Sequence, residues 1–121
     1  MQTANGGYFE QENPTFGVAA ATGQYRRVKF DGDGLLTLDG ATGNVHLGVT
    51  NRETFAAGKP VSLTLRTDEQ IKRMIAGGVI GFGVEVFKAA DGKVAATGSV
   101  RIGISVSSTT VDGDIVEVLE C

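Results

Sequence analysis

The chain carries H-L-G-V-T-N-R-E-T-F-A-A-G-K-P-V-S-L-T-L at residues 46–65 and R-I-G-I-S-V-S-S-T-T-V-D-G-D-I-V-E-V-L-E at residues 101–120. The two stretches align without a gap when position 46 is set against position 101. Glycines and apolar residues keep their places in this alignment: Gly48 with Gly103, Gly58 with Gly113, Leu47 with Ile102, Val61 with Val116 and Leu63 with Val118. Because the glycines and the apolar positions match in one frame, the pattern predicts that one structural unit is present twice.

A second pair of stretches extends the repeat upstream. V-K-F-D-G-D-G-L-L at 28–36 matches V-F-K-A-A-D-G-K-V at 86–94, and the second copy is slightly shorter between the two blocks. In both copies the last stretch alternates apolar and polar side chains, which is typical of a strand with one buried face. The sequence therefore predicts two similar β units, at about 28–65 and 86–120.

The composition favours a small all-β protein. A length of 121 residues fits one domain. The 18 glycines, set among short runs of Val, Ile, Leu and Thr, favour many strands joined by tight turns. We predict a small, single-domain β-barrel or sandwich made of two similar halves. Residues 1–24 show neither strand alternation nor a helical period, so they are predicted to form an extended N-terminal arm before a β-rich body at 25–121.

The arm and the residues that follow it supply the candidate binding residues. Tyr8, Phe9 and Phe16 are large apolar side chains on a segment without a core of its own, which favours a segment that becomes ordered on a partner. The alternative is a frayed terminus. Arg26 and Arg27 begin a small basic patch, which is either a solvated strand face or a contact for an acidic surface on a protein partner.

The stretch F-D-G-D-G-L-L-T-L at 30–38 resembles either a metal-binding loop or a turn. The second copy keeps Asp91 and Gly92 but has Ala89 where the first copy has Asp31. A calcium loop also needs further oxygen ligands at regular spacing, which the following L-L-T-L does not supply. An Asp-Gly pair between apolar runs is a strong turn signal, so we predict a turn.

The segment R-T-D-E-Q-I-K-R-M-I-A-G-G at 66–78 is compatible with two structures. Thr67 and Gln70 fit a helix capping box. Alternatively, a short strand would place Ile71, Arg73 and Ile75 on one side. We favour a strand, or a single helical turn, that connects the two copies.

The sequence predicts no catalytic residue, cofactor site or metal site. His46 is the only histidine and precedes an apolar strand, so we expect it at the surface or at a strand edge. Zinc needs three or four ligands, and Cys121 is the only cysteine. Ser107 and Ser108 lie in no G-x-S-x-G turn. The glycine-rich G-G-V-I-G-F-G at 77–83 lacks the Lys-Ser/Thr of a phosphate-binding P-loop. We predict that the protein is not an enzyme.

Charge and hydrophobicity narrow the possible partners. The net charge of −3 argues against a nucleic-acid surface, which normally carries a basic stripe. The first residues have neither the basic nor the apolar region of a signal peptide, and no apolar run approaches the ~20 residues of a membrane span. The lone cysteine is compatible with a reducing cytoplasm. We expect no nucleic-acid and no membrane partner.

Four segments together suggest a family. They are Y-R-R-V-K-F-D-G-D-G at 25–34, H-L-G-V-T at 46–50, I-A-G-G-V-I-G-F-G-V-E-V-F-K-A-A-D-G-K-V at 75–94 and R-I-G-I-S-V-S-S-T-T-V-D-G-D-I-V-E-V-L-E at 101–120. In this order they resemble the small capsid decoration (cement) proteins of tailed bacteriophages, over roughly residues 25–120. The charged R-T-D-E-Q-I-K-R-M at 66–74 departs from the shorter linker of that family.

The resemblance implies a β-tulip-like fold and a structural role without catalysis. It implies that the protein is made in the cytoplasm of a host bacterium and binds the outer surface of the virion head, where it stabilises the lattice of the major capsid protein. It also implies self-association, as a homotrimer or as a dimer. On this basis Tyr8, Phe9, Phe16, Arg26 and Arg27 are the predicted capsid-binding residues. The alternatives are a head-tail joining or tail-tube protein of the virion and a small β-barrel ligand-binding module.

Overall fold

The structure is a computed structural model that describes residues 15–43, 46–53, 56–65 and 70–121. The described residues form ten short strands and one 3-10 turn, η1 at Ala90–Gly92. The strands are β1 (Thr15–Gly17), β2 (Arg27–Phe30), β3 (Leu36–Leu38), β4 (Gly48–Thr50), β5 (Pro60–Leu65), β6 (Gln70–Ile75), β7 (Glu85–Lys88), β8 (Val94–Ala95), β9 (Arg101–Ser105) and β10 (Ile115–Glu120).

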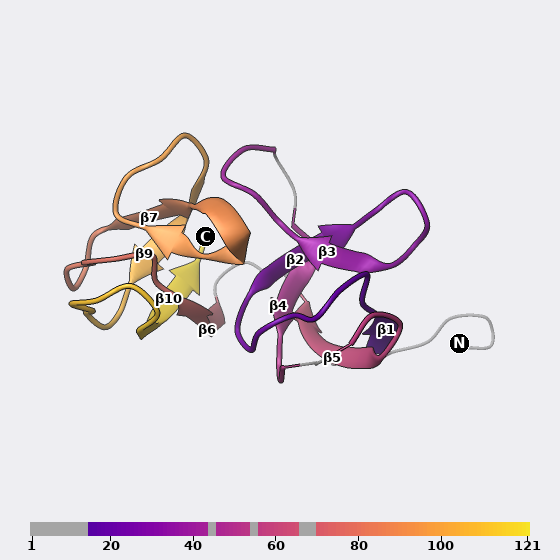
Figure 1. The fold of residues 1–121 in the computed structure, drawn as a ribbon. Coiled ribbons are helices and arrows are strands. Elements are labelled where there is room, and N and C mark those ends of the chain that lie inside the picture. Colours follow the sequence, from indigo (N-terminus) through magenta and orange to yellow (C-terminus); the bar gives the residue numbers. More distant parts are fainter. Residues whose placement is uncertain (1–14, 44–45, 54–55, 66–69) are drawn as a thin grey trace.

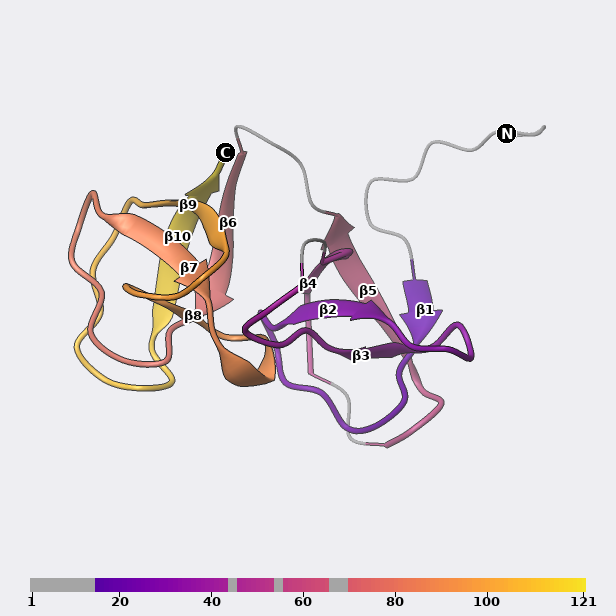
Figure 2. The same ribbon diagram turned by 90° about the horizontal axis from the view of Figure 1, so that it is seen from above.

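The strands form two five-stranded sheets that lie side by side, one from each half of the chain (Figures 1 and 2). The strand order is β1-β5-β4-β2-β3 in the first sheet and β6-β10-β9-β7-β8 in the second. A parallel bridge from Val18 to Leu36 connects the two edges of the first sheet, and a bridge from Ala76 to Val94 does the same in the second. Each half is therefore a small, curled barrel, and the predicted all-β fold of two similar halves is confirmed.

The repeat holds at the level of strand register. Gly48 pairs with Leu65 in the first sheet, and Gly103 pairs with Glu120 in the second, at the positions that the sequence alignment sets against each other. The pairs Val28–Gly48 and Val86–Gly103 reproduce the upstream block of the alignment on the other side of the same strands. The alignment read from the sequence is thus an alignment of hydrogen-bonded positions.

The two barrels have equivalent cores. In the first half five apolar side chains are almost completely buried: Val18, Val28, Leu36, Val61 and Leu63. Their equivalents in the second half are also buried: Ala76, Val86, Val94, Val116 and Val118. Burying one Val or Leu side chain contributes about 1.5–3 kcal/mol to the stability of the fold. Because each core contains few such side chains, the contact between the halves also contributes to the stability of the folded protein.

The boundary of the predicted N-terminal arm is corrected by strand β1. Residues 1–14 lie outside the described residues, but Thr15–Gly17 pair with β5 in the first sheet. Phe16 pairs with Val61 as Met74 pairs with Val116, so β1 belongs to the repeated unit. The sequence missed it because this strand is only three residues long, too short for an alternation to show.

Two other local predictions agree with the structure. The Asp-Gly stretch at 31–34 is a turn between β2 and β3, in which Asp31 Oδ1 accepts hydrogen bonds from the backbone N–H groups of Asp33 and Leu35. Of the ambiguous segment at 66–78, residues 70–75 form strand β6, while 66–69 are outside the described residues. The buried side chains of β6 are Lys72 and Met74, the face opposite to the one named from the sequence.

Candidate functional site

A buried cluster of charges joins the two halves. Arg27 on β2 of the first half forms an ion pair with Asp39, and Lys88 on β7 of the second half reaches the same carboxylate at 2.8 Å. All three side chains are almost completely buried. Arg27 also donates to the backbone carbonyls of Ala89 and Lys93 in the second half. This cluster fixes where the halves meet, because its charges are satisfied by groups from both of them.

A second buried cluster lies at Glu120, the last residue of β10. Its Oε1 accepts a hydrogen bond from Lys72 Nζ at 2.6 Å, and its Oε2 lies 3.0 Å from Nε2 of His46 in the first half. Lys72 also donates to the carbonyl of Leu65 in the first half. His46 was predicted at the surface, and that prediction is wrong because its ring is enclosed between the halves and only 2% exposed.

Burial shifts the pKa values in these clusters. Burial lowers the pKa of His46 below its ordinary value, and Glu120 only partly offsets this effect. For Glu120, burial alone would raise the carboxyl pKa, but the hydrogen bonds from His46 and Lys72 outweigh it and the pKa is lowered. Burial likewise lowers the pKa of Arg27, against the effect of Asp39. Near neutral pH we therefore expect a neutral His46 beside an ionised Glu120.

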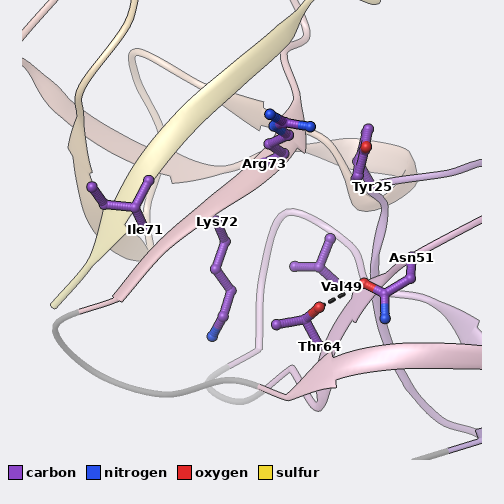
Figure 3. A pocket seen from close by; sticks show the side chains of 7 residues that line it. All are labelled: Tyr25, Val49, Asn51, Thr64, Ile71, Lys72 and Arg73. Carbon is purple, nitrogen blue, oxygen red and sulfur yellow. Dashed lines mark hydrogen bonds between the residues drawn. The ribbon is translucent and has the colours of Figure 1, made fainter. Parts of the chain in front are cut away.

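A small cleft opens beside these clusters, between β6 of the second half and β4 and β5 of the first (Figure 3). Its volume is about 210 Å³. Thr64 donates a hydrogen bond to Asn51 beside the cleft, and the amine of Lys72 donates to the Leu65 carbonyl. The lining residues are Tyr25, Val49, Asn51, Thr64, Ile71, Lys72 and Arg73. The cleft is smaller than the ~300–1,000 Å³ of typical small-molecule sites.

Two loops of the second half, at 77–84 and 106–114, expose large apolar side chains. The loops lie side by side, because Ile80 and Thr109 form an antiparallel bridge. Ile80 is buried as an anchor, whereas its loop neighbours Val79 and Phe82 are 70% and 72% exposed. The other exposed large apolar residues in or next to these loops are Val84, Val111 and Ile115. Exposed apolar groups on an ordered frame are typical of protein-binding surfaces.

Side-chain hydroxyl groups hold the 77–84 loop in place. Ser105 Oγ accepts a hydrogen bond from the Val84 N–H and donates to the Gly81 carbonyl. Thr109 Oγ1 accepts from the Ile80 N–H and donates to the Gly78 carbonyl. The loop is therefore ordered from beneath, and the exposure of Phe82 does not come from fraying.

The predicted capsid-binding residues lie in different environments. Tyr8 and Phe9 lie outside the described residues. Phe16 is half-buried in β1, where its ring packs edge-on against Phe30 at a centroid distance of 5.1 Å. Arg26 is half-buried and donates to the Asp91 carbonyl of the second half.

Arg27 was predicted to face a protein partner, and the structure corrects this prediction. Its guanidinium group is completely buried between the two halves, so it holds the molecule together and is not offered to a partner. The sequence analysis did not identify the other members of the two buried charge clusters, which are Asp39, Lys72, Lys88 and Glu120. No local pattern marks them, since all are charged residues within ordinary strand or loop sequences.

The serine and cysteine residues that were considered as nucleophiles occupy ordinary structural positions. Ser107 Oγ accepts a hydrogen bond from the Glu117 N–H, and Ser108 and Cys121 are exposed. Within the described ranges, no group of three His, Cys, Asp or Glu side chains is arranged to hold a metal ion. Among the same residues, no helix has the length and apolar character needed to span a membrane.

The comparisons with known proteins find a similarity at the level of structure. No protein-family model matches the chain, and no curated protein matches it in sequence. Among solved structures, the N base of the head fiber gp8.5 of bacteriophage phi29 is similar, with a TM-score of 0.71 and 18% sequence identity. The match covers 90% of this chain and 92% of that chain. At this identity the likeness shows a shared fold, and it extends over both halves.

Proposed function

We propose that this protein is a structural component of a bacteriophage head, and that it binds the outer surface of the assembled capsid as a decoration protein. The observation that carries the proposal is the fold shared with the phi29 head fiber base over nearly all of both chains. The four sequence segments that resemble phage decoration proteins support it independently. In this role the protein is made in the host bacterium and acts without catalysis.

The proposed partners are the major capsid protein and further copies of this chain, most simply as a trimer. A standard interface buries ~800 Å² per partner, more than a few exposed side chains supply. A trimer on a repeating lattice needs less from each contact, because the binding is multivalent. Tyr8 and Phe9 are proposed to anchor the N-terminal residues on the capsid.

Two alternatives are less well supported. A head-tail joining or tail-tube protein would share the β-rich composition, but no feature of the described residues favours it. A ligand-binding module would need a concave site, and the cleft between the halves holds only about 210 Å³. The chain contains no Trp, so an aromatic-lined carbohydrate site is also hard to build.

The test is co-sedimentation of the purified chain with empty expanded heads, and separately with tails, of the phage that carries the gene. We expect the chain to sediment with heads, to add density on their outer surface in electron micrographs, and to raise the temperature at which they rupture. Binding to tails alone would replace the proposal with the joining or tube function. Binding to neither would refute it.

A matched pair of variants tests the anchoring residues. Tyr8→Ser combined with Phe9→Ser is expected to weaken head binding at least tenfold, while Gln2→Ser combined with Gln11→Ser leaves it unchanged. Both variants keep β1, so the first barrel remains complete. Equal binding by the two variants would show that the apolar side chains before β1 are not anchors.

A further inference from the structure

Most of the sequence that forms the two exposed loops of the second half carries no charge. Neither residues 75–84 nor residues 102–111 include a charged side chain, although charged residues make up 21% of the chain. The loops lie side by side at the outer end of the second half (Figures 1 and 2). We call their exposed large apolar residues the paired-loop surface, which consists of Val79, Phe82, Val84, Val111 and Ile115. Depletion of charge around an exposed aromatic side chain is typical of the centre of a protein–protein interface.

The first half supplies a comparison, because it has the same pair of loops on the same backbone frame. In the second half the Ala76 N–H donates a hydrogen bond to the Asp114 carbonyl at 2.8 Å. In the first half the Val18 N–H makes the equivalent bond to the Lys59 carbonyl at 3.1 Å. Backbone hydrogen bonds therefore build the frame in both halves, and the outward side chains are free to differ.

The outward side chains do differ between the two halves. Three exposed residues of the first half that are small or polar are replaced by larger apolar ones in the second half: Ala21 by Val79, Gln24 by Phe82 and Ala56 by Val111. The first-half stretches also carry charges, at Arg26, Arg52 and Glu53. Because the same frame forms with small and charged residues, folding does not require the apolar ones. Their presence in the second half alone indicates a role in binding.

The charges that border the paired-loop surface are paired within the chain. Lys93 Nζ lies 2.8 Å from Asp112 Oδ1, and Arg101 Nε lies 3.4 Å from Glu85 Oε2. A partner therefore does not have to supply opposite charges at this border. A polar rim of this kind around an apolar centre is usual in protein–protein interfaces. The surface that complements it is apolar and uncharged.

The paired-loop surface has the size that a protein partner needs. The exposed fractions of its five side chains correspond to on the order of 500 Å² of apolar surface, with about 150–200 Å² for a fully exposed large side chain. A standard interface buries ~800 Å² per partner, of which ~57% is apolar. The five side chains can therefore supply the apolar part of one standard interface.

The rest of the chain offers no matching surface within the residues that the structure describes. Outside the paired-loop surface, the exposed large apolar side chains among these residues are Phe30 and Ile71. Phe30 lies between Lys29 and Asp31, and Ile71 is followed by Lys72. Each is thus a single apolar group beside charged residues. The uncharged, apolar surface that complements the loops is therefore sought on a different protein.

We propose that the paired-loop surface docks on an uncharged, apolar surface of the major capsid protein. This inference rests on the proposed function and deepens it, because it names the side of the molecule that meets the head. The second half then makes the capsid contact. The first half, with small or charged residues at the equivalent positions, supports it through the buried charge clusters.

A loop variant, Val79→Ala combined with Phe82→Gln, tests the surface by co-sedimentation with empty expanded heads. It gives the second half the residues found at the equivalent positions of the first half, so the frame is expected to form and the melting temperature to stay the same. We expect it to bind heads at least tenfold more weakly than the wild-type chain. The difference should persist in about 1 M salt, where charge interactions are screened beyond about 3 Å.

The possible outcomes separate this inference from the proposed function. A wild-type chain that does not bind heads would refute the proposed function and this inference with it. Equal head binding by the wild-type chain and the loop variant would overturn the inference alone. A difference that disappears in high salt would also overturn it, because charges would then carry the contact. Sedimentation equilibrium of the free chains tests the other occupant: a lower mass for the loop variant would show that the surface joins copies of this chain, against the inference.

Two further variants separate a lost contact from a general effect. Ile71→Gln removes an apolar side chain that is 59% exposed but lies on β6 outside both loops, and we expect it to bind heads as the wild-type chain does. Val111→Ala introduces the residue found at the equivalent position 56, and it replaces the loop variant if that variant loses its thermal transition. It is expected to weaken head binding at least threefold. Unchanged head binding by a folded Val111→Ala, or an equal loss in Ile71→Gln, would count against the inference in the same way.

Discussion

Gly103 lies where two backbones approach too closely for any side chain. A Cβ atom placed on Gly103 would collide with the carbonyl oxygen of Leu119 across the β9–β10 pair. The equivalent Gly48 would collide in the same way with the Thr64 carbonyl in the first half. Because both obstacles are backbone atoms of a paired strand, neither can turn aside as a flexible side chain would. This explains why glycine is identical at these two positions of the repeat.

We expect Gly103→Ala to lower the free energy of unfolding by about 2 kcal/mol or more, since the added methyl group forces the strands apart. The measurement is the urea unfolding midpoint. Gly32→Ala is the control, because no atom lies within 4 Å of a Cβ at that turn position. It should change the stability by less than about 1 kcal/mol. Equal effects of the two substitutions would contradict the close-approach explanation.

At the scale of elements, a hydroxyl group at the equivalent position binds the equivalent loop in both halves. Thr50 Oγ1 accepts from the Arg26 N–H and donates to the Gly23 carbonyl, as Ser105 does for Val84 and Gly81. The repeat thus preserves a polar contact, although the loop side chains differ. In the first half the loop contacts the second half, and in the second half it faces outward.

Ser105→Ala removes the hydroxyl from the second loop, so that the Val84 N–H and the Gly81 carbonyl lose their hydrogen bonds to it. We expect a loss of about 1–3 kcal/mol in the free energy of unfolding. Amide exchange at Val84 should accelerate more than exchange in β10. Ser108→Ala, at an exposed position, should alter neither quantity. An unchanged Val84 exchange rate in Ser105→Ala would show that the loop is held by other contacts.

At the scale of the whole molecule, buried charges pair across the contact between the halves, beside the apolar packing of Val49 and Tyr25 against the core of the second half. Buried ion pairs are costly to desolvate, and removing one partner leaves the other charge uncompensated, at a cost of roughly 3–5 kcal/mol. The relative position of the halves is thereby specified, because a shift would unpair Asp39, Lys88, Glu120 or Lys72. The buried charges also make this contact sensitive to pH.

We expect the protein to lose stability in two stages on acidification. The folded state lowers the pKa of His46, so below its ordinary pKa of 6.5 the unfolded chain binds more protons than the folded one. Stability therefore falls as the pH drops from about 6.5 through the folded pKa. The lowered pKa of Glu120 adds a second loss below its ordinary 4.5. The check is the melting temperature, followed from neutral to acidic pH.

His46→Gln is the matched control for the first stage. His46 is the only histidine, so its replacement should flatten the melting temperature between about pH 5 and 6.5. The loss at lower pH, which depends on Glu120, should persist in the variant. The imidazole resonance of the wild-type protein should titrate below about pH 6.5. A titration above that value would contradict the assignment of a buried, neutral ring.

Some features of the fold could be predicted from the sequence and others could not. The register of the repeat, the Asp31 turn and the buried valines could all be predicted, because each depends on residues near one another or on a period of two. Strand β1 could not, since so short a strand shows no period. The burial of His46 and Arg27 could not either, because groups that enclose them, such as Glu120 and the Ala89 carbonyl, come from the other half of the chain.

The sequence alone determined the repeated β unit, its turns and its apolar interior, because strand alternation and glycine placement are local consequences of backbone geometry. Only the tertiary structure decided which side of each unit meets the other. That choice depends on the pairing of charged residues far apart in the sequence. A charged residue gives the same sequence signal whether it is exposed or buried. Two copies of one unit can pack through equal or unequal surfaces, and this chain uses unequal ones.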